Sequence, residues 1–401
     1  MPSESRAIRV ECADDWHGLE PYRHLWDALA VEASTPYSLS AWGLSWWLAA
    51  RPRGACLRVI LIFQGDRLIG VAPFFASRMA PGLWRYAMLG GSLAAGVDVL
   101  ARHGCERVVA SAVREYLTTI LPRPSLIRVD GVETDRSLLR SWASEPTLIA
   151  QKRYTKGAPY VDLCSGNGKT GWLASQSSHF RQQYRRRRRY LEGAGGRLRV
   201  LESGPQLRTG VGNLLALHNK RWAERGGSKA VSRSTQFMLE TLVDQLTGSG
   251  HLRLILAEAR GEVIAAVLVV AAGGEAACWL SGFDTTWGRA SPVMLTFVEA
   301  ARDAQERKAM RLDLGPGRQA YKYRLSKDER ILQWLNLSPP GVAGRFARLV
   351  STPEAVRTAA TLALLERLRP DQVVALQRAR SHVKWGTLQH LARALRRDSE
   401  V

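Results

Sequence analysis

Residues 279–325 carry the pattern that decides the fold, and they read WLSGFDTTWGRASPVMLTFVEAARDAQERKAMRLDLGPGRQAYKYRL. The apolar segment Trp279–Phe283 predicts a strand, which runs through a short polar loop into a helix that begins at Ser291-Pro292. Serine is a preferred residue just before a helix, and proline is a preferred first helical residue. The helix predicted over Pro292–Arg307 leads to a second strand, Met310–Leu314, so the stretch predicts a strand–helix–strand unit.

The start of this helix is a predicted phosphate site. Free backbone N–H groups and the helix dipole favour anions at a helix N-terminus. Arg289 lies just before that N-terminus and adds a positive charge. The sequence therefore predicts that a phosphate-bearing cofactor binds at Arg289, Ala290, Ser291, Pro292 and Val293.

The elements predicted around this unit occur twice along the chain. In both halves, two helices precede a hairpin, a further strand and another helix. The hairpin strands Leu57–Leu61 and Leu252–Leu256 have nearly the same sequence and lie 195 residues apart. The strands that follow them, Leu68–Ala72 and Val263–Val267, are separated by the same 195 residues. We therefore expect a mixed α/β fold with two tandem domains, over residues 1–158 and 159–336, each with a mixed, twisted sheet, and a helical basic tail over residues 337–401.

The tail has a helix signal of its own. Thr352 reads as a capping residue, with Pro353 as the first residue of a helix. Basic residues outnumber acidic ones from Ser338 onward. These features predict helices with a basic face, and they indicate no specific role.

The net charge of the chain narrows the class of ligand. The formal charge is +21 and the isoelectric point about 10.4. The excess is concentrated in residues 178–225, which include the run Arg185–Arg189. Such a field attracts polyanions: nucleic acid, an anionic membrane surface or a phosphate-rich cofactor.

Cysteine usage and hydropathy predict the location of the protein. The five cysteines are widely spaced and form no Cys-x-x-Cys pair, which argues against a disulfide framework and a zinc site. The first residues lack the apolar segment of a signal peptide. The longest apolar run, Val263–Ala272, is much shorter than the about 20 residues that span a bilayer. We therefore expect a reduced, cytoplasmic protein with no integral membrane segment and no metal site.

Six short motifs follow one another in the second half, namely Arg185–Arg189, Arg221-Trp222, Gly282-Phe283-Asp284, Ser291-Pro292, Asp313-Leu314-Gly315 and Tyr321-Lys322. Their order resembles the GNAT (N-acetyltransferase-like) superfamily, and specifically its double-domain branch, often called CelD/BcsL-like, which is related to the Fem-type aminoacyltransferases. The resemblance is best in the second half and thin in the first. Typical acetyl-CoA enzymes of this superfamily have a Gly-x-Gly turn where this chain has residues 289–293, which leaves the identity of the acyl donor open.

The resemblance implies an acyltransferase that passes an acyl group directly from acyl-CoA, in the simplest case acetyl-CoA, to an amine or hydroxyl acceptor. Tyr321 is then the general acid that protonates the departing thiolate, with a half-exposed packing tyrosine as the alternative. Asp313 orients the amine or acts as a base, or it caps the following loop. His218, which shares a helix face with Trp222, is a further catalytic candidate or a core histidine. Lys322 contacts a phosphate or is solvated.

The acceptor and two rival functions stay open. A small molecule, a saccharide or a peptide would enter the cleft between the domains. A Fem-like enzyme would instead use aminoacyl-tRNA, with the tRNA backbone on Arg185–Arg189. A non-catalytic nucleic-acid-binding protein is the third possibility, because Tyr184 and Tyr190 flank that arginine run and aromatic side chains stack on bases.

Overall fold

The computed structural model describes residues 7–133, 135–142, 147–164, 171–223, 228 and 231–353. The first half of the chain contains β1 (Ile8–Ala13), α1 (Arg23–Glu32), α2 (Ser40–Ala50), β2 (Cys56–Gln64), β3 (Arg67–Ala80), β4 (Leu83–Met88), β5 (Leu100–Ala101), α3 (Glu106–Thr119), β6 (Leu126–Glu133), α4 (Leu138–Ser141) and β7 (Ile149–Asp162).

The second half repeats this order after two additional helices. It contains α5 (Gly171–Ser175), α6 (Ser178–Gly193), β8 (Arg197–Leu201), α7 (Pro205–Ala223), α8 (Arg233–Leu246), β9 (Leu252–Ala259), β10 (Glu262–Ala272), β11 (Glu275–Phe283), α9 (Pro292–Glu306), β12 (Arg311–Asp313), the short 3-10 helix η5 (Lys322–Arg324) and β13 (Glu329–Ser338).

The strands join in one sheet, in the order β1-β2-β3-β4-β6-β13-β7-β12-β11-β10-β9-β8, with β5 attached to β3. From either edge inward, the two halves follow the same sequence of strands, β1 to β6 and β8 to β12. The innermost pair of each half, β4–β6 and β11–β12, is parallel, and the neighbouring pairs are antiparallel. The predicted mixed α/β fold of two tandem halves is confirmed, and the two predicted mixed sheets are joined into one continuous sheet.

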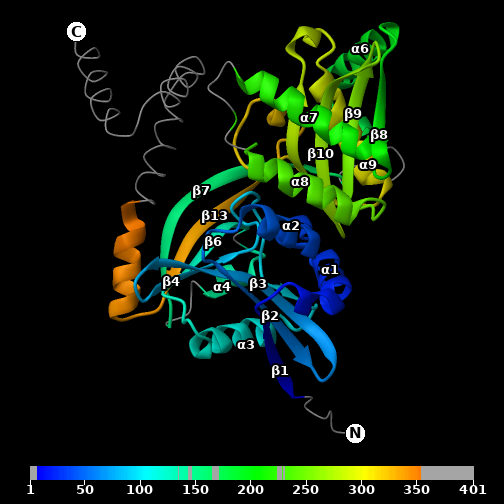
Figure 1. Cartoon of the computed structure of the whole chain (residues 1–401). Coiled ribbons are helices and arrows are strands. Elements are labelled where there is room, and N and C mark those ends of the chain that lie inside the picture. The colour runs from blue at the N-terminus through cyan, green and yellow to red at the C-terminus, as the bar shows by residue number, and fades with distance from the viewer. Residues whose placement is uncertain are drawn as a thin grey trace, which may run out of the picture.

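The two central strands are exchanged between the halves. β7, from the first half, pairs with β12 of the second half, and β13, from the second half, pairs with β6 of the first. β7 and β13 also pair with each other along Glu329–Ser338, and Figure 1 shows them side by side between the upper and lower halves. The boundaries expected near residues 158 and 336 fall inside these two strands.

The main hydrophobic core is continuous across the halves. Helix α2 of the first half packs against α8 of the second, and side chains of both belong to one buried cluster. Trp42, Trp46 and Trp47 of α2 are all buried in it, so this tryptophan stripe packs in the core, as its helical spacing indicates. Among the described residues, no helix combines the length and the apolar character needed to cross a bilayer.

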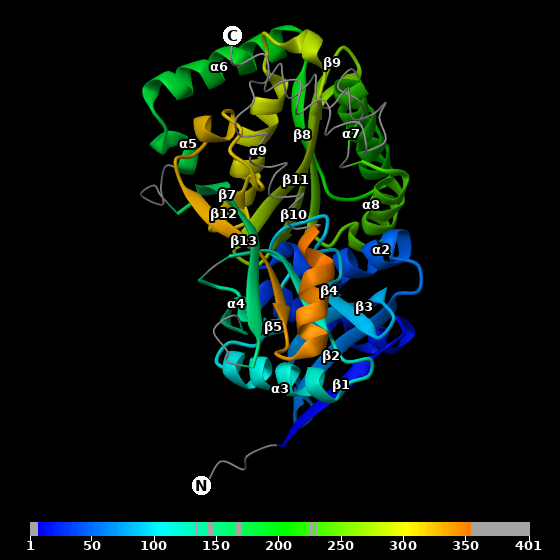
Figure 2. The same cartoon turned by 90° about the vertical axis from the view of Figure 1, so that its left-hand side faces the viewer.

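The described part of the tail is a helix over residues 342–353, drawn in orange in Figure 2, where it lies in front of β4 and β13. The helix start expected at Thr352 is wrong. Thr352 lies inside the helix, and its hydroxyl donates to the carbonyl of Arg348 at 2.7 Å. Gly341, with φ of +94°, precedes the helix and provides the turn that starts it. Residues 354–401 of the expected tail lie outside the described residues.

Candidate functional site

A cleft opens where β11 and β12 diverge. The two parallel strands pair only over Glu275–Ala277 and Arg311–Asp313. Beyond these residues lies a cavity of about 450 Å³. Its walls are β11, the loop after β12, η5 and, from the first half of the chain, Tyr37 and residues 92–95. Both halves therefore contribute to the cleft.

A β-bulge shapes the β11 wall of this cleft. Leu280 pairs with Leu268 of β10 and Cys278 pairs with Val269, so Trp279 is the extra residue between them. The Trp279 indole donates to the carbonyl of Leu93 at 3.1 Å and meets Trp42 edge to face at 5.3 Å. The bulge thus attaches β11 to the first half and redirects the strand at the point where the cleft begins.

Tyr321 and Lys322 lie next to each other in the cleft lining. The Tyr321 ring packs 5.6 Å from the ring of Phe297 on α9, and burial raises the pKa of Tyr321 to about 12. Its phenol is therefore protonated at neutral pH. Lys322 is only 3% exposed and donates from Nζ to the carbonyls of Gly315 at 2.8 Å and Pro316 at 3.2 Å. Burial lowers the pKa of Lys322 to about 8, so the solvated alternative for Lys322 is wrong.

Asp313 ends β12 and is 2% exposed. Its Oδ1 accepts from the N–H of Gly315 at 2.9 Å, which is the loop-capping role that the sequence left open. Its Oδ2 accepts from Arg330 of β13 at 2.6 Å. Because both oxygens are engaged, Asp313 fixes the loop that carries one wall of the cleft.

Arg330 belongs to a buried ion network that sequence reasoning missed. It also contacts Glu275 at 3.1 Å and Glu133 at 3.2 Å, and Arg311 pairs with the same two glutamates. Burial alone would lower the pKa of Arg330, but Asp313, Glu275 and Glu133 together raise it. These residues come from β6, β11, β12 and β13, so no local sequence signal could have linked them.

His218 lies on α7 behind β11 and is not among the residues that line the cleft. Its Nδ1 lies 3.0 Å from the carbonyl oxygen of Ser281, and its Nε2 lies 2.8 Å from the hydroxyl of Ser228. Burial lowers the pKa of His218, which favours the neutral ring. Gly282 lets α7 approach β11 closely, since a Cβ at this position would lie only 2.8 Å from the backbone nitrogen of His218. His218 thus holds the strand that forms the cleft wall.

The predicted phosphate site, residues 289–293, lies at the start of α9, and this helix begins at Pro292 as expected. Ser291 precedes it with φ of +45°, and its hydroxyl donates to Gly288 O at 3.2 Å and does not cap the helix. The N–H groups of Ala290 and Ser291 donate to Trp287 O and Gly288 O. Because the turn uses these amides and Pro292 has none, an anion here depends mainly on side-chain charge.

Arginines supply that charge from three elements. Arg289 is exposed and lies 5.0 Å over the ring of Tyr190 on α6, beside the basic run of that helix. The pKa of Arg187 is lowered mainly by burial, and the positive charges of Arg324 on η5 and of Arg186 lower it further. These three guanidinium groups therefore lie close enough to repel one another. The start of α9, the run Arg185–Arg189 and η5 therefore form one positive region, of which the sequence analysis missed Arg324.

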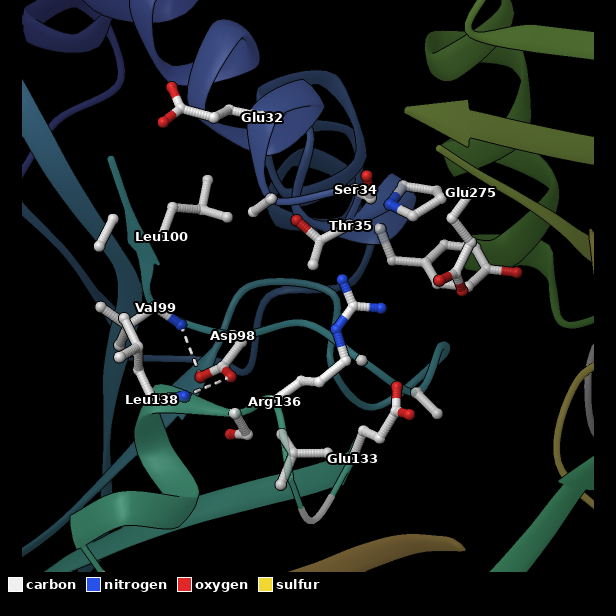
Figure 3. Close-up of a pocket in the computed structure, with 18 of the residues that line it drawn as sticks. Glu32, Ser34, Thr35, Asp98, Val99, Leu100, Glu133, Arg136, Leu138 and Glu275 are labelled. Carbon is white, nitrogen blue, oxygen red and sulfur yellow. Dashed lines mark hydrogen bonds between the residues drawn. The ribbon is translucent and has the colours of Figure 1, made fainter. Parts of the chain in front are cut away.

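A second cavity of about 290 Å³ adjoins the cleft, and Tyr37 and Ala95 line both. Figure 3 shows the carboxylates of Glu32, Glu133 and Glu275 around it. Asp98 also lines this cavity, and burial raises its pKa to about 6 although Val99 and Leu138 donate to it (Figure 3). Asp98 is thus a buried carboxylate that fastens the start of α4 to the loop that carries Asp98.

Residues 178–323 match the sequence profile of the acetyltransferase (GNAT) domain, and no curated protein matches the chain. Among the described residues, no group of His, Cys, Asp and Glu side chains is arranged to hold a metal ion.

Several solved structures are similar to the chain. The crystal structure of FemX has 12% identity and a TM-score of 0.58, covering 81% of this chain and 96% of FemX. The C-terminal domain of a putative lysylphosphatidylglycerol synthetase from Agrobacterium fabrum has 14% identity and a TM-score of 0.49, covering 74% and 88%. A tandem GNAT protein from the clavulanic acid biosynthesis pathway has 12% identity and a TM-score of 0.41, covering 83% and 100%. The chain therefore shares the overall fold of FemX, and its residues 178–323 are similar to the acetyltransferase (GNAT) domain.

Proposed function

We propose that the protein is an acyltransferase that moves an acyl group from acyl-CoA, in the simplest case acetyl-CoA, to an amine or hydroxyl. The observation that carries this proposal is the cleft between β11 and β12, with Tyr321 and Lys322 in its lining. Phosphates of the donor lie at residues 289–293, where Arg289, Arg187 and Arg324 supply positive charge in place of the amides that the turn consumes. The run Arg185–Arg189 then serves the donor phosphates and not a tRNA.

The chemical step in this proposal is direct attack. The acceptor nitrogen or oxygen bonds to the thioester carbonyl carbon, and the C–S bond then breaks. Backbone N–H groups of β11 beyond Ala277, where β12 no longer pairs, stabilise the oxyanion. Tyr321, whose phenol is protonated at neutral pH, gives its proton to the departing thiolate, and the proton that the acceptor nitrogen or oxygen loses returns to Tyr321. Burial and Asp313 raise the pKa of Cys278, the thiol in the cleft, which disfavours a covalent cysteine intermediate.

Asp313 and His218 act in this proposal as positioning residues. Asp313 holds the loop at the N–H of Gly315, and Lys322 binds the carbonyls of Gly315 and Pro316 in the same loop. His218 holds β11 at Ser281. The acceptor, a small molecule, saccharide or peptide, enters from the cavity beyond Tyr37, between the halves. As part of the same proposal we place the protein in the cytoplasm, where its five cysteines would stay free thiols. We also place it in the CelD/BcsL-like branch of the GNAT superfamily.

Binding of the donor tests this proposal directly. Calorimetry with acetyl-CoA and with a long-chain acyl-CoA should give binding to the wild type that Arg289→Glu weakens by about 1–3 kcal/mol, the scale of a charge-assisted contact. Arg107→Glu, on the exposed side of α3, makes the same charge change away from the cleft and should leave binding unaltered. Absence of binding to the wild type, or equal loss in both variants, would contradict the assignment.

A further inference from the structure

Most charged side chains that line the second cavity, of about 290 Å³ and next to the cleft, already have partners. The buried ion network pairs Glu133 and Glu275 with Arg311 and Arg330. The other engaged carboxylates are those of Glu32, Asp98 and Glu106, which accept from the backbone N–H groups of His103, Val99 and Gly104. A ligand is therefore recognised by the polar groups of this lining that remain free.

The hydroxyl of Tyr37 is one such free group. Tyr37 is only 7% exposed, and it lines both the second cavity and the cleft. Its ring packs 4.7 Å from the ring of Trp42, which fixes its position. Among the described residues the hydroxyl has no hydrogen-bond partner, yet its oxygen is not enclosed by protein atoms. Buried polar groups normally find partners, so this one indicates a polar ligand in the adjoining space.

The charges around the Tyr37 hydroxyl show where it points and which form it takes. Burial raises the pKa of Tyr37, and the carboxylates of Asp313 and Glu275 raise it further. The phenol therefore keeps its proton at neutral pH and can donate a hydrogen bond. Because Asp313 lines the cleft and Glu275 lines the second cavity, the hydroxyl points to the place where the two meet.

Arg136 supplies a second free donor. It precedes α4 and is exposed, and no ion pair or hydrogen bond joins its side chain to another described residue. Figure 3 shows its guanidinium reaching across the cavity toward Thr35, which lies two positions before Tyr37. The cavity thus presents two donors, one charged and one neutral, that have no acceptor within the described part of the chain.

The charge of the whole site favours a carboxylate over a phosphate as that acceptor. Five carboxylates and three guanidinium groups line the second cavity. Just outside it, Arg102 and Lys322 add two positive charges and Asp313 adds a negative one, which makes six negative charges against five positive. These surroundings repel a dianion such as a phosphate monoester, whereas they accept a molecule with one carboxylate and one ammonium group.

We propose that the second cavity binds a small molecule with a carboxylate and an amino group, of the amino acid class, through Arg136 and the Tyr37 hydroxyl. A carboxylate has two acceptor oxygens, so it can accept from a guanidinium and from a hydroxyl at the same time. The volume of the cavity is close to the lower end, about 300 Å³, of small-molecule sites, which suits a molecule of this size.

The bound molecule is the acyl acceptor, and this part of the inference rests on the proposed function. Tyr37 and Ala95 line both the second cavity and the cleft, so a carboxylate held at Tyr37 leaves the amino group free to enter the cleft, where Tyr321 lies. The ammonium group first releases one proton to solvent in the open cavity. Its nitrogen is then the nucleophile that bonds to the thioester carbonyl carbon.

Calorimetric titration of the full chain with each common L-amino acid, without an acyl donor, tests the binding site. At least one should bind, and its α-amide, which lacks the carboxylate, should bind roughly 10-fold more weakly or less. Tyr37→Phe keeps the ring against Trp42 and removes only the hydroxyl, and Arg136→Gln removes the guanidinium. Each variant should weaken binding by roughly 10-fold or more, the scale of a lost hydrogen bond to a charged group.

Matched controls make the same two changes elsewhere. Tyr116→Phe on α3 and Arg123→Gln in the loop before β6 lie outside the cavity lining and should bind as the wild type does. The binding site is refuted if no amino acid binds the wild type at millimolar concentration, if the amide binds as tightly as the acid, or if the controls lose as much affinity as the cavity variants.

The acceptor role has a readout of its own. Because the titrations contain no acyl donor, their outcome does not depend on whether acetyl-CoA binds. Incubation of the bound amino acid with acetyl-CoA, followed by mass spectrometry, should give its N-acetyl derivative, and Tyr37→Phe should form less of it at a subsaturating amino acid concentration. Recovery of the amino acid unchanged, from a chain that binds acetyl-CoA, would overturn the acceptor role and leave the donor site standing.

Discussion

Replacing Arg330 by methionine should destabilise the protein more than the loss of any surface ion pair does. The Arg330 side chain is 10% exposed, and those of its partners Asp313 and Glu275 are 3% and 6% exposed. In the variant, Glu275 and Glu133 still have Arg311, whereas Asp313 keeps only the N–H of Gly315. One buried carboxylate is then left without a cation.

The expected cost is about 3–5 kcal/mol, the range for breaking a buried ion pair on one side. Urea denaturation followed by tryptophan fluorescence measures it. Arg318→Met provides the control, because Arg318 pairs with Glu329 from an exposed position and should cost about 1 kcal/mol or less. Adding Asp313→Asn to Arg330→Met removes the stranded charge. The loss in the free energy of unfolding of the double variant should therefore be smaller than the sum of the two single losses, by about 1 kcal/mol or more. A loss for Arg330→Met no larger than for Arg318→Met, or simple additivity, would refute the reasoning.

The remaining predictions concern the cleft and the positive region. Tyr321→Phe should lower kcat by roughly 100-fold or more with little change in KM, since proton transfer typically contributes this much, and an unchanged kcat would exclude Tyr321 from the step. Between pH 8 and 10.5 the free energy of unfolding of the wild type should rise with pH, because Lys322 keeps its proton in the unfolded chain and loses it in the folded one. Lys322→Met should remove this rise. That rise is about 1.4 kcal/mol per pH unit at most, and urea denaturation at several pH values measures it. Changing Arg185–Arg189 to glutamine should raise the KM for acyl-CoA and leave most activity at saturating acyl-CoA, with a shallow salt dependence; loss of activity at saturating acyl-CoA together with a steep salt dependence would indicate a tRNA donor.

Local signals in the sequence predicted much of the fold and only part of the candidate site. Ser291-Pro292 marked the start of α9, and the repeated hairpin strings located β2–β3 and β9–β10. The same signals could not show that the Ser291 hydroxyl leaves the helix uncapped, because that depends on the turn at Gly288. Arg330 meets Glu133 across 197 positions of sequence, and composition gives no sign of such a pairing. Trp279 likewise reads as one more strand residue until the first half is packed against it.

The exchanged strands set the order in which the molecule can be completed during synthesis. β6 has β4 on one side, and its other neighbour, β13, ends only at Ser338. At about 5–20 residues per second, a ribosome needs on the order of 10–40 s to pass from the end of β6 to the end of β13. Throughout that interval β6 presents unpaired N–H and C=O groups, the kind of edge that pairs with other chains. The half that is made first is therefore among the last parts to close, and slow elongation or truncation before Ser338 leaves a nascent chain prone to aggregation.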